Sequence, residues 1–143
     1  MSPERLETAL GAFCEHPSVE NRRELVGALA ASELFFVIDE RETPEAPIRL
    51  AFTHDASGNA VVPGFTDKGR LALWLRTGGP IAQAPASGFV PALLSGPFAG
   101  LVVNPGSEAS VVVYRRVLEA LSTQDEASLE RSIAGEFTVV RWL

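Results

Sequence analysis

Apolar residues recur at helical spacing over residues 1–30. They are Leu6, Leu10 and Phe13 in a first segment, and Leu25, Val26 and Leu29 in a second. Spacings of three and four residues place each set on one face of a helix. His16-Pro17 ends the first helix, because the residue before a proline is driven out of helical geometry. Ser18 is a good N-cap for the second helix, so the segment predicts a helical hairpin.

Three segments that follow have the pattern of β-strands. Residues 34–38 are continuously apolar, which is typical of a strand covered on both faces, and residues 48–53 alternate between apolar and polar. The third segment, 60–65, contains Pro63, which has no N–H for a ladder and therefore indicates an edge position or a bulge. The polar stretch 41–47 is expected to be a loop and residues 55–59 a turn. The three strands most simply form an antiparallel meander.

The middle of the chain alternates helix and strand signals. Thr66 is the expected cap of a helix with Asp67 in its first turn, and Gly78-Gly79-Pro80 is the expected end of that helix. Residues 81–87 have no regular pattern and are expected to be irregular. A short helix over residues 89–94 and a buried strand over residues 100–103 follow.

The last third begins with the turn Asn104-Pro105-Gly106-Ser107. Residues 112–121 then follow helical spacing, although 111–114 equally fits a strand. Residues 123–126 have the form of a capping box before a last helix that ends at Gly135, and residues 137–143 read as a final strand.

Together these elements predict one α+β domain over residues 1–143, with a mixed sheet of about five strands, packed helices and an N-terminal helical hairpin. The expected core is Phe36, Ile38, Leu50, Phe52, Phe65, Leu71, Trp74, Leu101 and Val103.

Composition narrows the class of partner. The net charge of −6 and the lack of a basic stripe argue against nucleic acid, since phosphate backbones repel an acidic surface. The pairs Arg22-Arg23 and Arg115-Arg116 fit the solvated faces of helices. A single cysteine, Cys14, excludes an intramolecular disulfide, and no apolar run is long enough to span a membrane. We expect a cytoplasmic protein.

No catalytic or metal-binding motif stands out. Cys14, His16 and His54 lack the spacing of a zinc site, and no nucleophile elbow supports a site built from His54, Asp55 and Ser107. There is no P-loop or Gly-x-Gly-x-x-Gly pattern, so no cofactor is expected. The one candidate ligand site is the turn at Asn104, Gly106 and Ser107. Its amides would bind an anion if they opened a helix, whereas turn chemistry alone also explains these residue types.

Two segments resemble the N-terminal domain of the SseB family, named for enhanced serine sensitivity. One is the run from Val62 to Leu71, VPGFTDKGRL, followed by Trp74; the other is the run from Gly100 to Ser107, GLVVNPGS. Their order and their separation of about 40 residues fit the family, and the resemblance covers about residues 20–121. It implies neither catalytic residues nor a cofactor.

The chain has packing residues and turns but no convergent set of titratable groups. We therefore expect a non-enzymatic protein-binding or regulatory module, of bacterial type. The alternative is a small-ligand sensor or enzyme that uses the turn at Asn104 to Ser107. The apolar segment 137–143 needs cover, which its own sheet, another protein or a second copy in a homodimer would provide.

Overall fold

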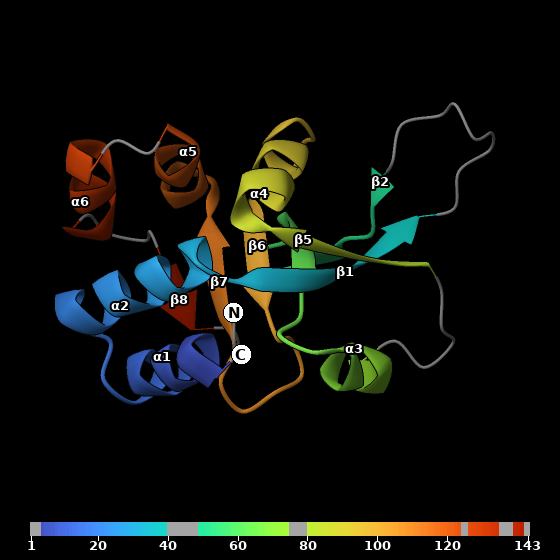
Figure 1. Cartoon of the computed structure of the whole chain (residues 1–143), viewed down its shortest axis with the longest axis horizontal. Coiled ribbons are helices and arrows are strands. Elements are labelled where there is room, and N and C mark those ends of the chain that lie inside the picture. The colour runs from blue at the N-terminus through green and yellow to red at the C-terminus, as the bar shows by residue number, and fades with distance from the viewer. Residues whose placement is uncertain (1–3, 40–48, 75–79, 124–125, 135–138, 142–143) are drawn as a thin grey trace.

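The computed structural model describes residues 4–39, 49–74, 80–123, 126–134 and 139–141. Figure 1 shows their α+β arrangement, with α4, α5 and α6 along the upper margin and α1 and α3 along the lower one. The helices are α1 Glu4–Glu15, α2 Val19–Ala30, α3 Lys68–Trp74, α4 Ala86–Leu94, α5 Arg115–Thr123 and α6 Glu126–Ala134. The strands are β1 Glu33–Asp39, β2 Arg49–Leu50, β3 Thr53–His54, β4 Ala60–Gly64, β5 Ile81–Pro85, β6 Gly100–Val103, β7 Val111–Tyr114 and β8 Val139–Arg141. The predicted fold class is confirmed.

The N-terminal helical hairpin is present as expected. The hydroxyl of Ser18 accepts a hydrogen bond from the backbone N–H of Asn21 at 3.1 Å and so caps α2. The side chain of Asn21 donates to the carbonyls of His16 and Ala12, at 2.7 and 3.2 Å, which closes the connection between the helices. Among the described residues no helix has the length and apolarity that a membrane crossing requires.

The strands form two sheets instead of one. A mixed five-stranded sheet has the order β3-β4-β6-β7-β8, with β4 and β6 parallel and the other pairs antiparallel. A three-stranded antiparallel sheet has the order β2-β1-β5. Phe35 of β1 and Phe65, next to β4, exchange two backbone hydrogen bonds of 2.8 and 2.9 Å that join the two sheets. The expected sheet of about five strands is therefore the larger of the two.

The predicted meander is wrong because residues 49–54 are divided between the sheets: 49–50 form β2 and 53–54 form β3. Leu50 of β2 pairs with Ile38 of β1, whereas Thr53 of β3 pairs with Val61 of β4. Because the chain passes from one sheet to the other here, the alternating apolar and polar side chains do not all belong to the two faces of one sheet. Phe52, expected in the core, is therefore 50% exposed, and its ring contacts that of His54 edge to face and that of Phe98 at a tilt.

Two other segments show how tertiary pairing decides a strand. Residues 81–85 were expected to be irregular, yet they form β5 because β1 provides a long antiparallel partner. Pro63 lies in β4 beyond the last residue that pairs with β3, and its registered partner is Val102 of β6. The ring of Pro63 is tolerated because the ladder with β3 has already ended there.

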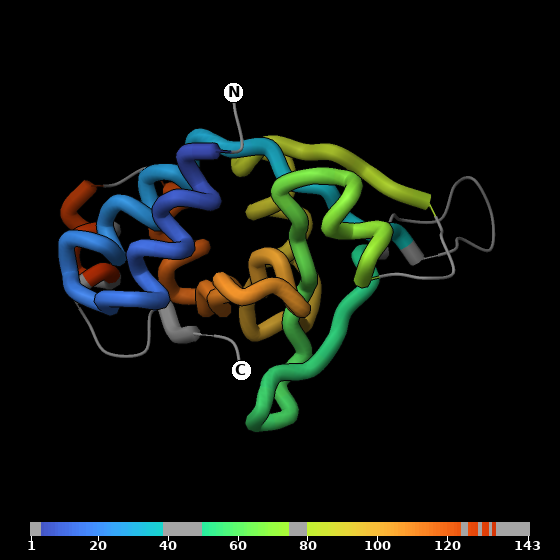
Figure 2. The backbone as a smooth tube through the Cα atoms, turned by 90° about the horizontal axis from the view of Figure 1, so that it is seen from below, coloured from blue at the N-terminus to red at the C-terminus, as the bar shows by residue number. Residues whose placement is uncertain are grey.

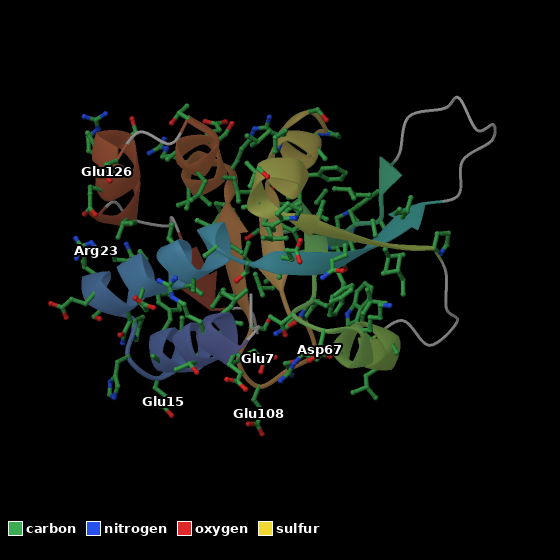
Figure 3. All side chains as sticks on the ribbon, viewed as in Figure 1. Glu7, Glu15, Arg23, Asp67, Glu108 and Glu126 are labelled. Atoms are coloured by element: carbon green, nitrogen blue, oxygen red, sulfur yellow. The ribbon has the colours of Figure 1, made fainter. Side chains whose placement is uncertain are left out.

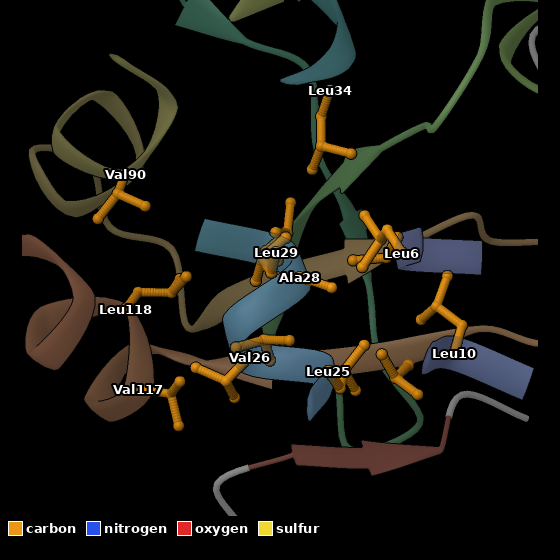
Figure 4. Packing of buried hydrophobic residues seen from close by; sticks show 14 of the residues in the cluster. Leu6, Leu10, Leu25, Val26, Ala28, Leu29, Leu34, Val90, Val117 and Leu118 are labelled. Atoms are coloured by element: carbon orange, nitrogen blue, oxygen red, sulfur yellow. The ribbon is translucent and has the colours of Figure 1, made fainter. Parts of the chain in front are cut away.

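One large core joins the helices to the sheets. Figure 4 shows residues of α2 in the main apolar cluster between Leu6 and Leu10 of α1 on one side and residues of α4 and α5 on the other. Of the expected core residues, five are at most 2% exposed: Phe36, Phe65, Leu71, Leu101 and Val103. Three are half-buried at its margins: Ile38, Leu50 and Trp74. Phe52 is the one exposed member of the set.

The end of the chain resolves two open alternatives. Residues 111–114 are a strand, and the helix that follows begins at Arg115. Thr123 belongs to α5, where its hydroxyl donates to the carbonyl of Ala120, so the capping box does not start at Thr123. Strand β8 pairs with β7, so residues 139–141 lie in the chain's own five-stranded sheet. The expected loop 41–47, the helix end at Gly78-Gly79 and the helix end at Gly135 lie outside the described residues.

Candidate functional site

The two segments that resemble the SseB family meet at Thr66 and Asn104. The backbone N–H of Thr66 donates to Oδ1 of Asn104 at 3.0 Å, and Nδ2 of Asn104 donates to the hydroxyl of Thr66 at 3.1 Å. Both residues are buried, at 4% and 2% exposure. Buried polar groups need such partners, because leaving one unsatisfied costs about 1–3 kcal/mol.

Thr66 is not the helix cap that the sequence suggested. The residue that caps α3 is Asp67, whose Oδ1 accepts a hydrogen bond of 2.7 Å from the backbone N–H of Arg70. The hydroxyl of Thr66 instead donates to Oε1 of Glu7 on α1 at 2.8 Å. Thr66 and Asp67 are adjacent and both are good caps, so the sequence could not tell which one caps α3. The structure decides, because Thr66 is hydrogen-bonded to the buried Asn104 and Asp67 is left to cap the helix.

Arg70 extends the network to the surface. Its Nε lies 3.4 Å from Oε1 of Glu7 and 3.4 Å from Oδ2 of Asp67, and its Nη1 donates to the hydroxyl of Ser107 at 3.1 Å. These contacts tie α1, α3 and the 104–107 turn together. Because the guanidinium lies between two carboxylates, most of its charge is offset locally.

The turn itself has the expected shape but not the expected continuation. Asn104 has a φ of 52° and Gly106 a φ of 87°, both in the left-handed region that asparagine and glycine adopt most readily. The N–H of Ser107 donates to the carbonyl of Asn104 at 3.1 Å, and the chain continues into β7 instead of a helix. The helix N-terminus that would have favoured an anion at Gly106 and Ser107 is therefore absent.

A groove runs on both sides of Arg70 and Leu73, and we call it the turn groove. One part has a volume of about 480 Å³ and the other about 240 Å³. The polar residues of its lining include Glu7, Arg70, Ser107 and Glu108. The apolar ones are Leu10, Leu73, Trp74, Pro105 and Ala109. Figure 3 shows Glu7, Asp67 and Glu108 gathered from α1, the start of α3 and the turn.

A comparison with protein families decides the relationship that the motifs suggested. The family model described as the SseB protein N-terminal domain matches residues 6–120. The chain belongs to the SseB family. Comparison of the chain with curated proteins finds no match, and comparison with solved structures finds none either. The SseB match starts in α1, earlier than the resemblance at about residue 20, and so includes Glu7 and the whole network around Thr66 and Asn104.

The other residues of this SseB domain that the sequence singled out are Cys14, His16, His54 and Asp55, and the structure does not bring them together as a site. Cys14 packs against the main core, and its Sγ lies 3.9 Å from the carbonyl oxygen of Ser110. His16 and His54 are exposed. Within the described ranges no three side chains of histidine, cysteine, aspartate or glutamate gather as metal ligands would. Asp55 accepts hydrogen bonds within its own turn and from the hydroxyl of Tyr114 at 3.1 Å.

Sequence reasoning missed Glu7, Arg70 and Leu73 as parts of the site. Arg70 and Leu73 lie in or next to the VPGFTDKGRL run and were read only as helix residues. Glu7 lies 63 positions from Arg70, on a helix that the motif resemblance left out. A charged residue on the polar face of an amphipathic helix gives no signal of its partner, so only the packing of α1 on the sheet reveals it.

Proposed function

We propose that the domain is a non-enzymatic protein-binding module that holds a segment of a partner protein in the turn groove. The observation that carries this proposal is Leu73, which is 81% exposed at the rim shared by both parts of the groove. A single exposed leucine alone would need no explanation, but Leu73 shares the lining of a hollow with Arg70 and Trp74, two residue types that are enriched at interface hot spots.

The polar residues that line the turn groove fit this role. Arg70 is 38% exposed and is held in place by Glu7, Asp67 and Ser107. A guanidinium that is already oriented loses little side-chain entropy when it donates further hydrogen bonds to a partner. Arginine beside apolar side chains is also the composition that interface hot spots favour.

The alternative, an anionic small ligand at Asn104 to Ser107, has less support. Asn104 is buried and uses its side chain on Thr66, while the amide of Ser107 is used within the turn. The carboxylates of Glu7, Asp67 and Glu108 lie around Arg70 or on the groove wall, and they would repel a free anion.

Leu73→Asp tests the proposal, with Ala72→Asp as the matched control on an exposed neighbouring position of the same helix. Affinity capture from the native cell, with mass spectrometry, should recover a partner with the parent chain and with Ala72→Asp. Leu73→Asp should lose at least about tenfold of it, because a charge would replace the apolar anchor. Equal recovery by the two aspartate variants would contradict the turn groove as the binding surface, and a metabolite recovered in place of a protein would favour the alternative.

We also propose that the domain works in the bacterial cytoplasm, consistent with its single cysteine and acidic composition. Self-association remains a prediction. Strand β8 is the outer strand of the five-stranded sheet, and a second copy would pair with its free edge. Light scattering on the full chain and on a chain lacking residues 137–143 measures this directly.

A further inference from the structure

Strand β5 has an outer edge whose backbone groups pair with no other strand in the part of the chain that the structure describes. In its ladder with β1, Ala82 lies opposite Phe36 and Gln83 opposite Phe35. Phe35 exchanges its backbone hydrogen bonds with Phe65, on the side away from β5. Because antiparallel ladders alternate, Ala82 and Ala84 bond to β1, whereas the N–H and C=O groups of Ile81 and Gln83 point away from it.

No described element covers this edge. β5 is an outer strand of the β2-β1-β5 sheet, and Figure 2 shows it running along the margin of the molecule. The side chains of Ile81, Gln83 and Pro85 are exposed, Ile81 at 42%. Pro85 lies at the end of β5, on the outward-facing register of Ile81 and Gln83, and has no N–H, so the edge is short and accepts a strand of limited length.

A cavity of about 550 Å³ begins where β5 ends. Its wall includes Pro85, which is also the last residue of β5, so a chain paired with Gln83 would reach the cavity after about two residues, roughly 7 Å. The lining is mainly small and apolar: Ala30, Ala31, Pro85, Ala86, Val90, Pro91, Ala120 and Leu121. Such a cavity fits an aliphatic side chain.

The charges around this cavity have one sign. Among its described lining residues, the charged ones are Glu33 at the start of β1 and Glu126 at the start of α6. Glu33 receives one hydrogen bond, from the side chain of Gln83 at 3.3 Å, and both carboxylates are exposed. A basic side chain would be attracted to this rim, and an acidic one would be repelled.

We propose that the β5 edge and this cavity together bind an extended segment of a partner protein that carries apolar side chains followed by a basic residue. Its backbone pairs with Ile81 and Gln83, an aliphatic side chain fills the cavity, and the basic group lies between Glu33 and Glu126. This mode is strand addition, in which main-chain bonds give affinity and the pocket gives specificity. The surface is separate from the turn groove and does not depend on the proposal made there.

A fluorescein-labelled peptide of alternating valine and threonine ending in two lysines is the probe, and anisotropy measures its binding. Gln83→Pro should weaken binding by about tenfold, because it removes one outward N–H, whereas Gln83→Ala should retain binding. Glu126→Lys should also weaken it by about tenfold, and Glu15→Lys, which changes the net charge equally but lies on α1 far from α6 in Figure 3, should not. Glu126→Lys leaves the ladder intact, so the test does not depend on how Gln83→Pro folds.

Amide hydrogen exchange, measured by NMR, shows directly which backbone N–H groups of β5 are hydrogen-bonded. In the free protein the amide of Gln83 should exchange fast and that of Ala82 slowly, and the probe should slow the exchange of Gln83. Absence of saturable binding up to about 1 mM would overturn the proposal. So would equal loss in Gln83→Ala and Gln83→Pro, or protection of Gln83 in a free protein that light scattering shows to be a dimer, because a second copy would then hold the edge. Leu73→Asp should bind the probe as the parent chain does, so failure of the turn groove would be seen separately.

Discussion

Asn104 supplies from its side chain the hydrogen-bond partner that the backbone of Thr66 would otherwise lack. Thr66 follows β4, and its N–H donates to the side-chain carbonyl of Asn104, 38 positions later, at 3.0 Å. The N–H of Asn104 in turn donates to the carbonyl of Gly64 at 2.8 Å. The parallel pair β4 and β6 is thus extended by a side chain beyond the point where the ladder ends.

The first prediction concerns the stability that this pair provides. Asn104→Ala should lower the free energy of unfolding by about 1–3 kcal/mol, because the buried N–H of Thr66 loses its partner. Asn104→Gly accepts the left-handed φ without strain but also loses the side chain, so it should be destabilised almost as much. Urea denaturation measures both. A stable Asn104→Gly would mean that the asparagine serves the backbone angle alone.

A second prediction concerns Gly100 in β6. A Cβ atom there would lie 2.4 Å from the carbonyl oxygen of Val113 in β7, closer than real contacts allow. Gly100→Ala should therefore cost about 2 kcal/mol or more, since two paired backbones must separate. Gly11→Ala in α1 is the control: among the described residues, an added Cβ there meets no atom within 4 Å beyond its chain neighbours and the backbone of its own helix, so the variant should gain up to about 1 kcal/mol from helix propensity. We expect the melting temperature of Gly100→Ala to lie below that of the parent chain and the melting temperature of Gly11→Ala to lie above it. Equal melting temperatures of the two variants would contradict this prediction.

The third prediction concerns pH and the Tyr114–Asp55 hydrogen bond. Partial burial acts to raise the pKa of Asp55, but hydrogen bonds from Asn59, Tyr114 and Ser57 outweigh it and hold the pKa below its usual 3.8. A lowered folded-state pKa contributes stability above the unfolded value, and that stability is lost as the pH falls through the folded pKa. Tyr114→Phe should raise the pKa of Asp55, measured by NMR titration of its carboxyl carbon, and should destabilise the domain less in strong acid than at neutral pH.

The fourth prediction concerns the same Tyr114–Asp55 hydrogen bond at high pH, where its contribution to stability is lost as the pH rises. Burial, the hydrogen bond to Asp55 and the negative charge of Asp55 raise the pKa of Tyr114 above its usual 10.0. The resulting stability is full below 10.0 and is lost as the pH rises through the folded pKa. Tyr114→Phe should remove this part of the alkaline loss. An unchanged stability profile above that pH in the variant would show that the phenol does not titrate with unfolding.

The pair Arg115-Arg116 shows where a charge pattern stops being informative. The sequence placed Arg115-Arg116 on a solvated face, and Arg116 is indeed exposed. Arg115 instead donates to the carbonyls of Leu94, Gly96 and Phe98 at 2.5–3.1 Å, where α4 has ended. The same helical spacing fits both positions, and only the placement of α4 beside α5 separates them.

Local sequence by itself determined the helical hairpin, the strands β1 and β6, the turn at residues 104–107 and the family. Helical spacing, the restricted geometry of a residue before proline and turn chemistry all act within a few residues. Tertiary structure decided the division of residues 49–54 between two sheets, the strand at 81–85, the roles of Thr66 and Asp67, and the meeting of Glu7 with Arg70. Each of these features depends on a partner from another part of the chain. The free energy of such a contact depends on both partners, so the local sequence of one of them does not reveal it.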